Sequence, residues 1–287
     1  PDSHSAEGRR WKEYLSSLSG SYEPIVRPHF GPYRESNPRE FVTSYRFLAQ
    51  TIKTVKDACG NEATFAPEIE NTRFTVYSKS SAATAMQLAL SGFAGCNNVT
   101  LSLFDLDGGA LSDEPEYRSL LKKQKPFSDR LCALDLGTAS DVGVTFPIAE
   151  NSASRLMLSE GENYEHLCGD NRQLENYFLK IGIPCKYEKS SDIKADEFVA
   201  LDSYGAKFLS DEELKNILKC SVFLDGQAAD VLCRRGYSEL IGIKSLNRRF
   251  DCVNAEFIKC FKRSDGTDIR IPSRVPKGFW YAAETSP

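Results

Sequence analysis

The sequence predicts an α/β protein in which short parallel strands alternate with helices. Two observations favour this fold class. The first 135 residues repeat one pattern three times: a short apolar run ends in polar and charged residues, and a helix-length amphipathic stretch follows. A second series of the same kind begins near Asp141 and continues to residue 243. Such alternation is typical of parallel sheets covered by helices.

In the first region, residues 1–135, we expect an initial helix over residues 6–18 and then three strand–helix pairs. The predicted strands span residues 24–30, 63–70 and 99–105, and the predicted helices span 38–59, 80–92 and 114–123. Right-handed repeats of this kind either close into an eight-stranded barrel or form an open doubly wound sheet, and the length of the region does not decide between them. In both architectures, functional residues lie at the C-terminal ends of the strands.

The second region, residues 141–243, shows the same alternation of strand and helix patterns, with shorter distances between the elements. We expect strands over 141–147, 197–205 and 221–226, and helices over 171–180, 210–219 and 227–235. Ser210 and Glu213 form a capping-box pair at the start of one helix, and Asp225 is expected to cap another. A third segment, residues 244–287, has short alternating strands around Asp265-Gly266, which predicts a hairpin that opens a further β segment.

The composition excludes several classes of function. The 287 residues suit about two domains, and a net charge of −4 lacks the basic excess of a nucleic-acid-binding protein. No apolar run approaches the roughly 18 residues of a membrane helix, and the first residues show no signal peptide, so we expect neither a nucleic-acid nor a membrane partner. The nine cysteines lack CxxC pairs, which predicts reduced cysteines and favours a cytoplasmic location without fixing the compartment.

The most specific motif is Pro67-Glu68-Ile69-Glu70-Asn71 at the end of a predicted strand. Side chains two residues apart in a strand point the same way, so Glu68 and Glu70 share one face, with Glu70 nearer the exit. Two interpretations remain open at this point. The pair is either a solvated strand end or a pair of carboxylates that does chemistry.

Polar residues at the ends of the neighbouring strands support a site around the two glutamates. They are Arg27, His29, Tyr33, Arg34 and Glu35 after one strand, and Asp105 and Asp107 after another. Taken singly, each has an ordinary structural explanation. Together they would converge on the glutamates as donors and acceptors for sugar hydroxyls. The FDLDGG segment lacks the spacing of a calcium-binding EF-hand loop, and no metal or cofactor is expected.

These segments carry a resemblance to a known family. RPHFGPYRE, PEIEN and YSKSSAATAMQLALSGFAGCNNVTLSLFD resemble the sixth, seventh and eighth βα units of bacterial glycoside hydrolases related to the family-42 β-galactosidases. The resemblance spans roughly residues 1 to 243, because residues 141–243 resemble that family's second domain, an α/β module akin to class I glutamine amidotransferases that serves in subunit assembly. The resemblance implies the last strands of a (β/α)₈ TIM barrel followed by a flavodoxin-like α/β domain, and a homo-oligomer formed through the second domain.

The resemblance also implies a chemistry. Retaining glycosidases use two carboxylates about 5 to 5.5 Å apart, one as nucleophile and one as acid and base. The nucleophile would come from the seventh strand, where we favour Glu70 and assign Glu68 and Asn71 to sugar binding, with the reverse assignment of the two glutamates left open. The acid/base residue would follow the fourth strand, which this sequence does not contain. We therefore expect a fragment that needs the missing N-terminal half of the barrel and is inactive alone on its carbohydrate substrate, a β-galactoside.

Other functions have weaker support in the sequence. The position that matches the amidotransferase nucleophile is Ser203-Tyr204, without a cysteine, and His166 lies far upstream. No GxGxxG or GxxxxGK[ST] follows a predicted strand, which disfavours a nucleotide-binding protein. The main alternative is a non-catalytic carbohydrate-binding or assembly protein on the same fold.

Overall fold

The structure is a computed structural model of the chain. It describes residues 11–18, 24–35, 39–60, 63–71, 79–104, 111–134, 136, 142–149, 173–251, 256–262, 268–274 and 278–285. The chain divides into two units, residues 1–223 and 224–287. The domain boundaries near residues 135–141 and 244 stay predictions. None of the helices in the described ranges is long and apolar enough to cross a bilayer.

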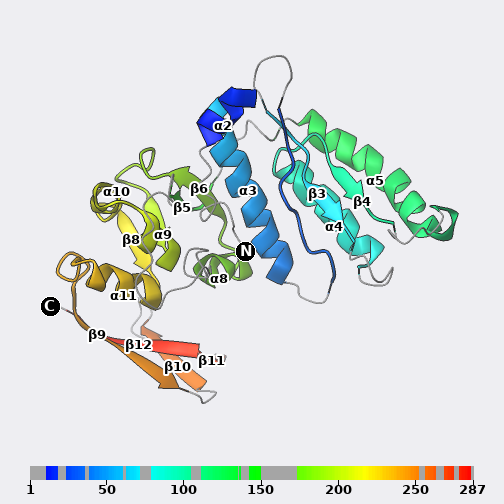
Figure 1. The fold of residues 1–287 in the computed structure, drawn as a ribbon. Helices are drawn as coiled ribbons and strands as arrows, with labels where there is room; N and C mark the ends of the chain where they lie inside the picture. The colour runs from blue at the N-terminus through cyan, green and yellow to red at the C-terminus, as the bar shows by residue number, and fades with distance from the viewer. Residues whose placement is uncertain are drawn as a thin grey trace. The chain divides into compact units, whose positions relative to one another are not determined.

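The predicted fold class is confirmed: parallel sheets alternate with helices. In the first half of unit 1, three stretches of chain lie side by side in sequence order. They contain β1 (Ile25–Val26), β2 (Thr64–Phe65) followed by β3 (Glu68–Glu70), and β4 (Thr100–Ser102), all paired in parallel. The Glu68 amide donates to the Pro28 carbonyl and the Phe30 amide to the Glu68 carbonyl, which continues the ladder beyond β1. We call this arrangement the first sheet (Figure 1).

The helices of this half are close to the predicted ones, with one correction. They are α2 (Trp11–Leu18), α3 (Arg39–Cys59), α4 (Ser81–Phe93), the short 3₁₀ helix η1 (Leu111–Asp113) and α5 (Pro115–Ala133). The predicted end of the last helix at residue 123 was wrong, because α5 continues through Pro126. Tyr117 and Leu131 are buried near opposite ends of α5, and packing at both ends offsets the backbone hydrogen bond that a proline removes.

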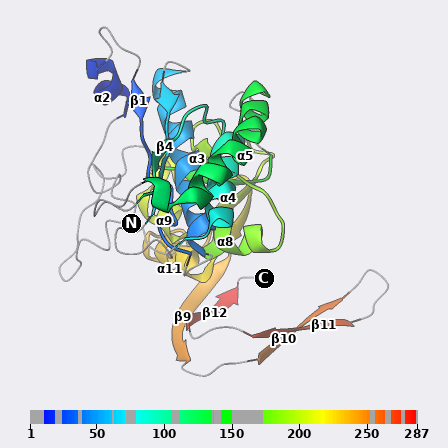
Figure 2. The ribbon, with the colours of Figure 1, turned by 90° about the vertical axis from the view of Figure 1, so that its right-hand side faces the viewer.

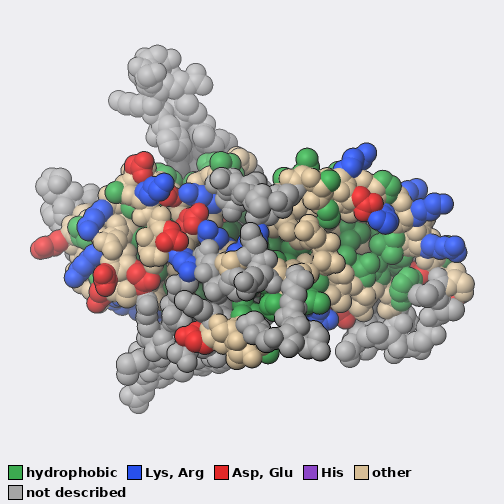
Figure 3. Space-filling model, turned by 90° about the horizontal axis from the view of Figure 1, so that it is seen from above, with side chains coloured by type: hydrophobic (Ala, Val, Ile, Leu, Met, Phe, Trp, Pro, Cys, Tyr) green, Lys and Arg blue, Asp and Glu red, His purple; other side chains and the backbone are tan. Residues whose placement is uncertain are grey.

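The core of the first sheet lies on one face. Phe30 and Ile69 from the strands are fully buried together with Leu48 and Val55 of α3. The outer side of α5 is basic, and its side chains appear along the right-hand side of Figure 3. The exposed basic residues of α5 are Arg118, Lys122, Lys123, Lys125 and Arg130.

The second sheet has four strands in the order β6-β5-β7-β8, with β5 parallel to both β6 and β7. The strands are β5 (Val144–Ile148), β6 (Cys185–Lys189), β7 (Phe198–Leu201) and β8 (Ser221–Leu224). The helices are α8 (Gln173–Lys180), α9 (Ser203–Phe208), α10 (Asp211–Ile217) and, in unit 2, α11 (Gly226–Arg234). The capping box of Ser210 and Glu213 is present, and Asp225 caps α11 by accepting from the Ala228 amide.

Two elements of this region, strand β6 and helix α9, were not predicted. The sequence of β6 is CKYEK, and Tyr187 is its only buried residue. The apolar pattern is therefore too weak to predict a strand from the sequence. The strand predicted over 197–205 instead ends at Leu201. The Asp202 carboxylate accepts from the Gly205 amide at 2.9 Å and caps α9, which ends the strand at this point.

Unit 2 ends in antiparallel strands. The two segments predicted as a hairpin are β10 (Glu256–Lys262) and β11 (Asp268–Arg274), which pair antiparallel. β9 (Ile243–Asp251) pairs antiparallel with β12 (Gly278–Thr285), and this outer pair was not predicted (Figure 2). The Asp265-Gly266 turn lies outside the described residues.

Helix α3 contacts both sheets of unit 1 through different sides of the helix (Figure 1). Its apolar residues Leu48, Ile52 and Val55 belong to the core of the first sheet, whereas Ala49 packs against the core of the second. Two basic side chains on the latter side pair with the second sheet's elements. Arg46 Nη1 lies 2.8 Å from Glu175 Oε2 of α8, and Lys53 Nζ lies 3.1 Å from Glu188 Oε2 of β6.

The Arg46–Glu175 pair is buried, with side-chain exposures of 3% and 2%. Burial raises the pKa of Glu175 to about 7, and the Arg46 charge opposes this shift only in part. Asp202, buried directly after β7, adds a second carboxyl group, and burial raises its pKa as well. Nε and Nη2 of Arg46 and Oε1 of Glu175 have no hydrogen-bond partner. One guanidinium therefore serves two carboxyl groups, and Glu175 takes up a proton more readily than an exposed glutamate.

Glu175→Gln is expected to flatten the pH dependence of stability. Because burial raises the pKa of Glu175 to about 7, the folded protein binds more protons than the unfolded chain above the ordinary glutamate pKa of about 4.3. The free energy of unfolding therefore falls as pH rises from about 4.3 toward about 7, by on the order of 1.4 kcal/mol for each unit of pKa difference. Urea unfolding at a series of pH values measures this slope.

Glu188→Gln is the matched control, because Glu188 pairs with the same helix at a more exposed position. The control should leave the slope nearly unchanged. An equal slope in wild-type protein and Glu175→Gln would show that Glu175 titrates normally in the fold.

Candidate functional site

The first sheet has a polar face opposite its apolar core. Glu68 and Glu70 project from β3 on this face, as the period of two predicts. His29 lies beside Glu68 in a parallel bridge, and Arg27, two residues earlier, points the same way. Phe30 and Ile69, at the intervening positions, are fully buried on the other face. The structure thus places Arg27 and His29 of one strand end beside Glu68 of the next strand.

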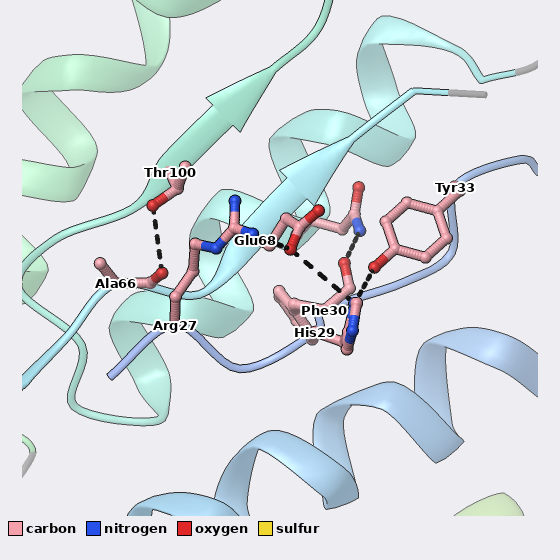
Figure 4. A network of polar contacts seen from close by, with 8 residues as sticks. Arg27, His29, Phe30, Tyr33, Ala66, Glu68 and Thr100 are labelled. Atoms are coloured by element: carbon pink, nitrogen blue, oxygen red, sulfur yellow. Dashed lines mark hydrogen bonds and ion pairs between the residues drawn. The ribbon is translucent and has the colours of Figure 1, made fainter. Parts of the chain in front are cut away.

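The Glu68 carboxylate lies between Arg27 and His29 (Figure 4). Its Oε2 is 3.4 Å from Arg27 Nη2 and 3.8 Å from His29 Nδ1. The Glu68 side chain is only 11% exposed, whereas the side chains of Arg27 and His29 are 56% and 75% exposed. A sheltered carboxylate is therefore paired with basic groups that solvent and ligands can reach.

Tyr33 contacts His29 and lies close enough to Glu70 for the Glu70 charge to act on its hydroxyl. Its hydroxyl lies 2.6 Å from His29 Nδ1. Burial, together with the negative charges of Glu68 and Glu70, raises the pKa of Tyr33 to about 12. The phenol therefore stays protonated at neutral pH, and its hydroxyl is held in the hydrogen bond with His29.

Lys79 is a central residue that the sequence analysis missed. It is buried, and its ammonium group donates to three acceptors: the Glu70 carbonyl at 2.8 Å, Gln87 Oε1 at 2.7 Å and the Pro32 carbonyl at 3.4 Å. Burial lowers the pKa of Lys79 to about 8, and the charges of Glu70 and Glu35 oppose that shift. The sequence gives no clear signal for this role, because a lysine directly before a helix N-cap is ordinarily solvated and only mildly unfavourable to the helix dipole.

Gln87 on α4 extends the network toward the first strand. Its Nε2 donates to the Phe30 carbonyl at 2.6 Å and approaches the Pro32 carbonyl at 3.4 Å. Lys79 and Gln87 together satisfy carbonyl groups where the first two strands leave the sheet. Such carbonyls have no ladder partner, and burial without a donor would be unfavourable.

Asn71, expected to bind substrate, is tied into the scaffold through its amide nitrogen. Asn71 Nδ2 donates to the Leu103 carbonyl at 2.8 Å and to Tyr117 Oη at 2.7 Å. Tyr117 in turn donates to the Lys79 carbonyl at 3.1 Å. The network therefore reaches the end of the third strand and α5.

The remaining predicted residues lie at the border of the site or beyond the described part. Glu35 Oε2 accepts from the Ser80 amide at 2.9 Å, at the N-terminus of α4, and the hydrogen bonds with Ser80 lower the pKa of Glu35. Arg34 is exposed. Asp105 and Asp107 lie outside the described residues. Within the ranges that the structure describes, no group of three or more His, Cys, Asp or Glu residues is placed to hold a metal ion.

The geometry defines a class of protein: an α/β protein whose polar site lies at the C-terminal ends of parallel strands. Its distinguishing features are two carboxylates on one strand face, basic side chains beside one of them, and a buried ammonium bound to the backbone carbonyl of the residue that carries the other. In comparisons with known proteins, no family model, no curated protein and no solved structure matches the chain. Function is therefore argued from the site itself.

Asn71→Ala is expected to destabilise the protein by about 1–3 kcal/mol, because it leaves the buried Tyr117 hydroxyl and Leu103 carbonyl without a donor. Urea unfolding measures the loss. In a double-mutant cycle, Asn71→Ala and Tyr117→Phe should show a coupling of about 0.5 kcal/mol or more. Ser112→Ala, at an exposed position, is the control and should have no effect. Additive effects of the two core changes would contradict the network.

Proposed function

We propose that the polar face of the first sheet belongs to a retaining glycoside hydrolase site of the β-galactosidase type, with Glu70 as nucleophile. The observation that carries this proposal is the pair of carboxylates at the exit of one strand, on the same face as Tyr33 and His29. Retaining hydrolysis needs an ionised carboxylate that reaches the anomeric carbon and polar groups that hold the sugar hydroxyls.

The contacts of the two acids support different roles. Glu68 Oε2 already lies near Arg27 and His29, and its side chain is sheltered. Glu70 is nearer the strand exit and is partly exposed. Attack on a sugar carbon requires an accessible oxygen, which favours Glu70. Glu68 then orients Arg27 and His29, whose exposed nitrogen atoms bind sugar hydroxyls.

We further propose that the first sheet is part of a (β/α)₈ barrel. Its strands are parallel, follow one another in sequence order and are each followed by a helix. Ile25 of β1 is 70% exposed and Leu101 of β4 is 39% exposed, and neither strand has a second partner among the described strands. Open edges of this kind would be covered by further barrel strands. The acid/base carboxylate would come from those strands.

The second sheet supports a flavodoxin-like domain with a role in assembly. Its strand order β6-β5-β7-β8 corresponds to 2-1-3-4, the order of flavodoxin-like sheets. At the turn from β7 to α9, Asp202 is a buried cap and Ser203 begins the helix. An amidotransferase thiol is absent from this turn, so the role proposed for the domain is structural, and the proposed homo-oligomer rests on the family resemblance alone.

Glu70→Gln should reduce kcat for a nitrophenyl β-galactoside by several orders of magnitude, because the amide cannot form the glycosyl-enzyme ester. The measurement requires a protein in which these residues stand within all eight barrel strands. Glu68→Gln is the matched change and should mainly raise KM. Near-normal hydrolysis by Glu70→Gln would reject the assignment.

The alternative is a carbohydrate-binding protein without hydrolysis, and the contacts of Glu68 with Arg27 and His29 favour it. A 2-deoxy-2-fluoro-galactosyl fluoride distinguishes the two functions. A hydrolase should gain the mass of one sugar on Glu70, as measured by peptide mass spectrometry. Binding of galactose without any adduct would support the non-catalytic protein.

A further inference from the structure

Lys79 connects three segments of the site through one buried ammonium group. Its acceptors are the backbone carbonyl of the candidate nucleophile Glu70, the carbonyl of Pro32 in the segment after the first strand, and the Gln87 side chain of α4. An ammonium group has three N–H donors, and the structure supplies three acceptors. Only 3% of Lys79 is exposed, so its ammonium group holds these three segments together and is too inaccessible to attack a substrate.

The charge of Lys79 acts on the carboxylates around it. Glu70 and Glu35 both stabilise the ammonium form of Lys79. Coulomb attraction is mutual, so the ammonium must stabilise the ionised form of Glu70 by the same interaction, and partial burial weakens the screening by water. The other charged or titratable groups near this pair are Glu68, whose negative charge disfavours a second carboxylate nearby, and Arg27, whose positive charge favours one, while the Tyr33 phenol is neutral.

The position is otherwise unfavourable for a lysine. Lys79 directly precedes Ser80, the N-cap of α4, where the helix dipole repels a positive charge. Burial also disfavours the ammonium form. A methionine would avoid both penalties but would leave the Glu70 and Pro32 carbonyls and Gln87 Oε1 without this donor, so the three hydrogen bonds account for a donor at this position.

We propose that Lys79 is a positioning residue that fixes the backbone of Glu70 and keeps its carboxylate ionised in the presence of Glu68. This inference rests on the proposed function only for the role of Glu70 as nucleophile. The electrostatic link between Lys79 and Glu70 holds whatever reaction the site performs, and it is tested on this chain without a substrate.

The experiment is a pH titration of the glutamate carboxyl carbons by ¹³C NMR, with the Glu70 signal assigned from its loss in Glu70→Gln. In Lys79→Met, the Glu70 midpoint should rise by about one pH unit or more, a tenfold change in proton affinity. Lys79→Arg keeps the charge and should stay within a few tenths of a unit of wild type. Gln87→Leu loosens the same network without removing a charge and should also leave the midpoint in place.

An unchanged Glu70 midpoint in Lys79→Met would overturn the inference, even if hydrolysis depends on Glu70. A shifted midpoint together with full hydrolysis by Glu70→Gln would instead reject the proposed function and keep the inference. If Lys79→Met does not fold, the reciprocal measurement applies. Glu70→Gln should lower the midpoint of Lys79, followed by lysine side-chain NMR, and no change there would equally contradict the link.

Discussion

The hydrogen bonds from Lys79 to the carbonyl groups at the strand exits are the interaction on which the first sheet and its site depend. Parallel strands end in carbonyl groups that the ladder leaves unpaired. Here Lys79 and Gln87 supply donors for the exits of the first two strands, and Asn71 supplies one for the third. The same donors fix the backbone of Glu70. The same hydrogen bonds therefore stabilise the strand ends and fix the position of the carboxylates.

A second buried cation, Arg46, links this arrangement to the second sheet. Residues 24–35 lead from the site toward α3, and α3 carries both the apolar residues of the first core and the guanidinium that contacts Glu175. An apolar pair of similar volume could be as stable as a buried ion pair. The ion pair does, however, require one register of α3 against α8, because a shifted helix would leave Arg46 and Glu175 buried without each other. The segment that carries Tyr33 thus leads into a helix of fixed register.

The sequence predicted those features that have a local period. The alternation of strands and helices, the common face of Glu68 and Glu70, and the caps at Ser210 and Asp225 depend on neighbours a few residues apart. Lys79 and Gln87 were missed because a polar residue in or before a helix is ordinarily solvated, and only the fold places strand carbonyls around it. The Arg46–Glu175 contact joins residues 129 positions apart, and no local pattern encodes it.

The arrangement of charge is the strongest argument that this face has a function. Glu68 and Glu70 repel each other on adjacent same-face positions, and the molecule balances them with Arg27 on one side and Lys79 on the other. A fold selected for stability alone would gain more from apolar or solvated residues at these positions. Two carboxylates at a strand exit, one sheltered and one partly exposed, are thus held beside a protonated phenol. The proposed glycoside hydrolysis would use this arrangement, because a sugar develops positive charge at its anomeric carbon during cleavage and carries several hydroxyl groups.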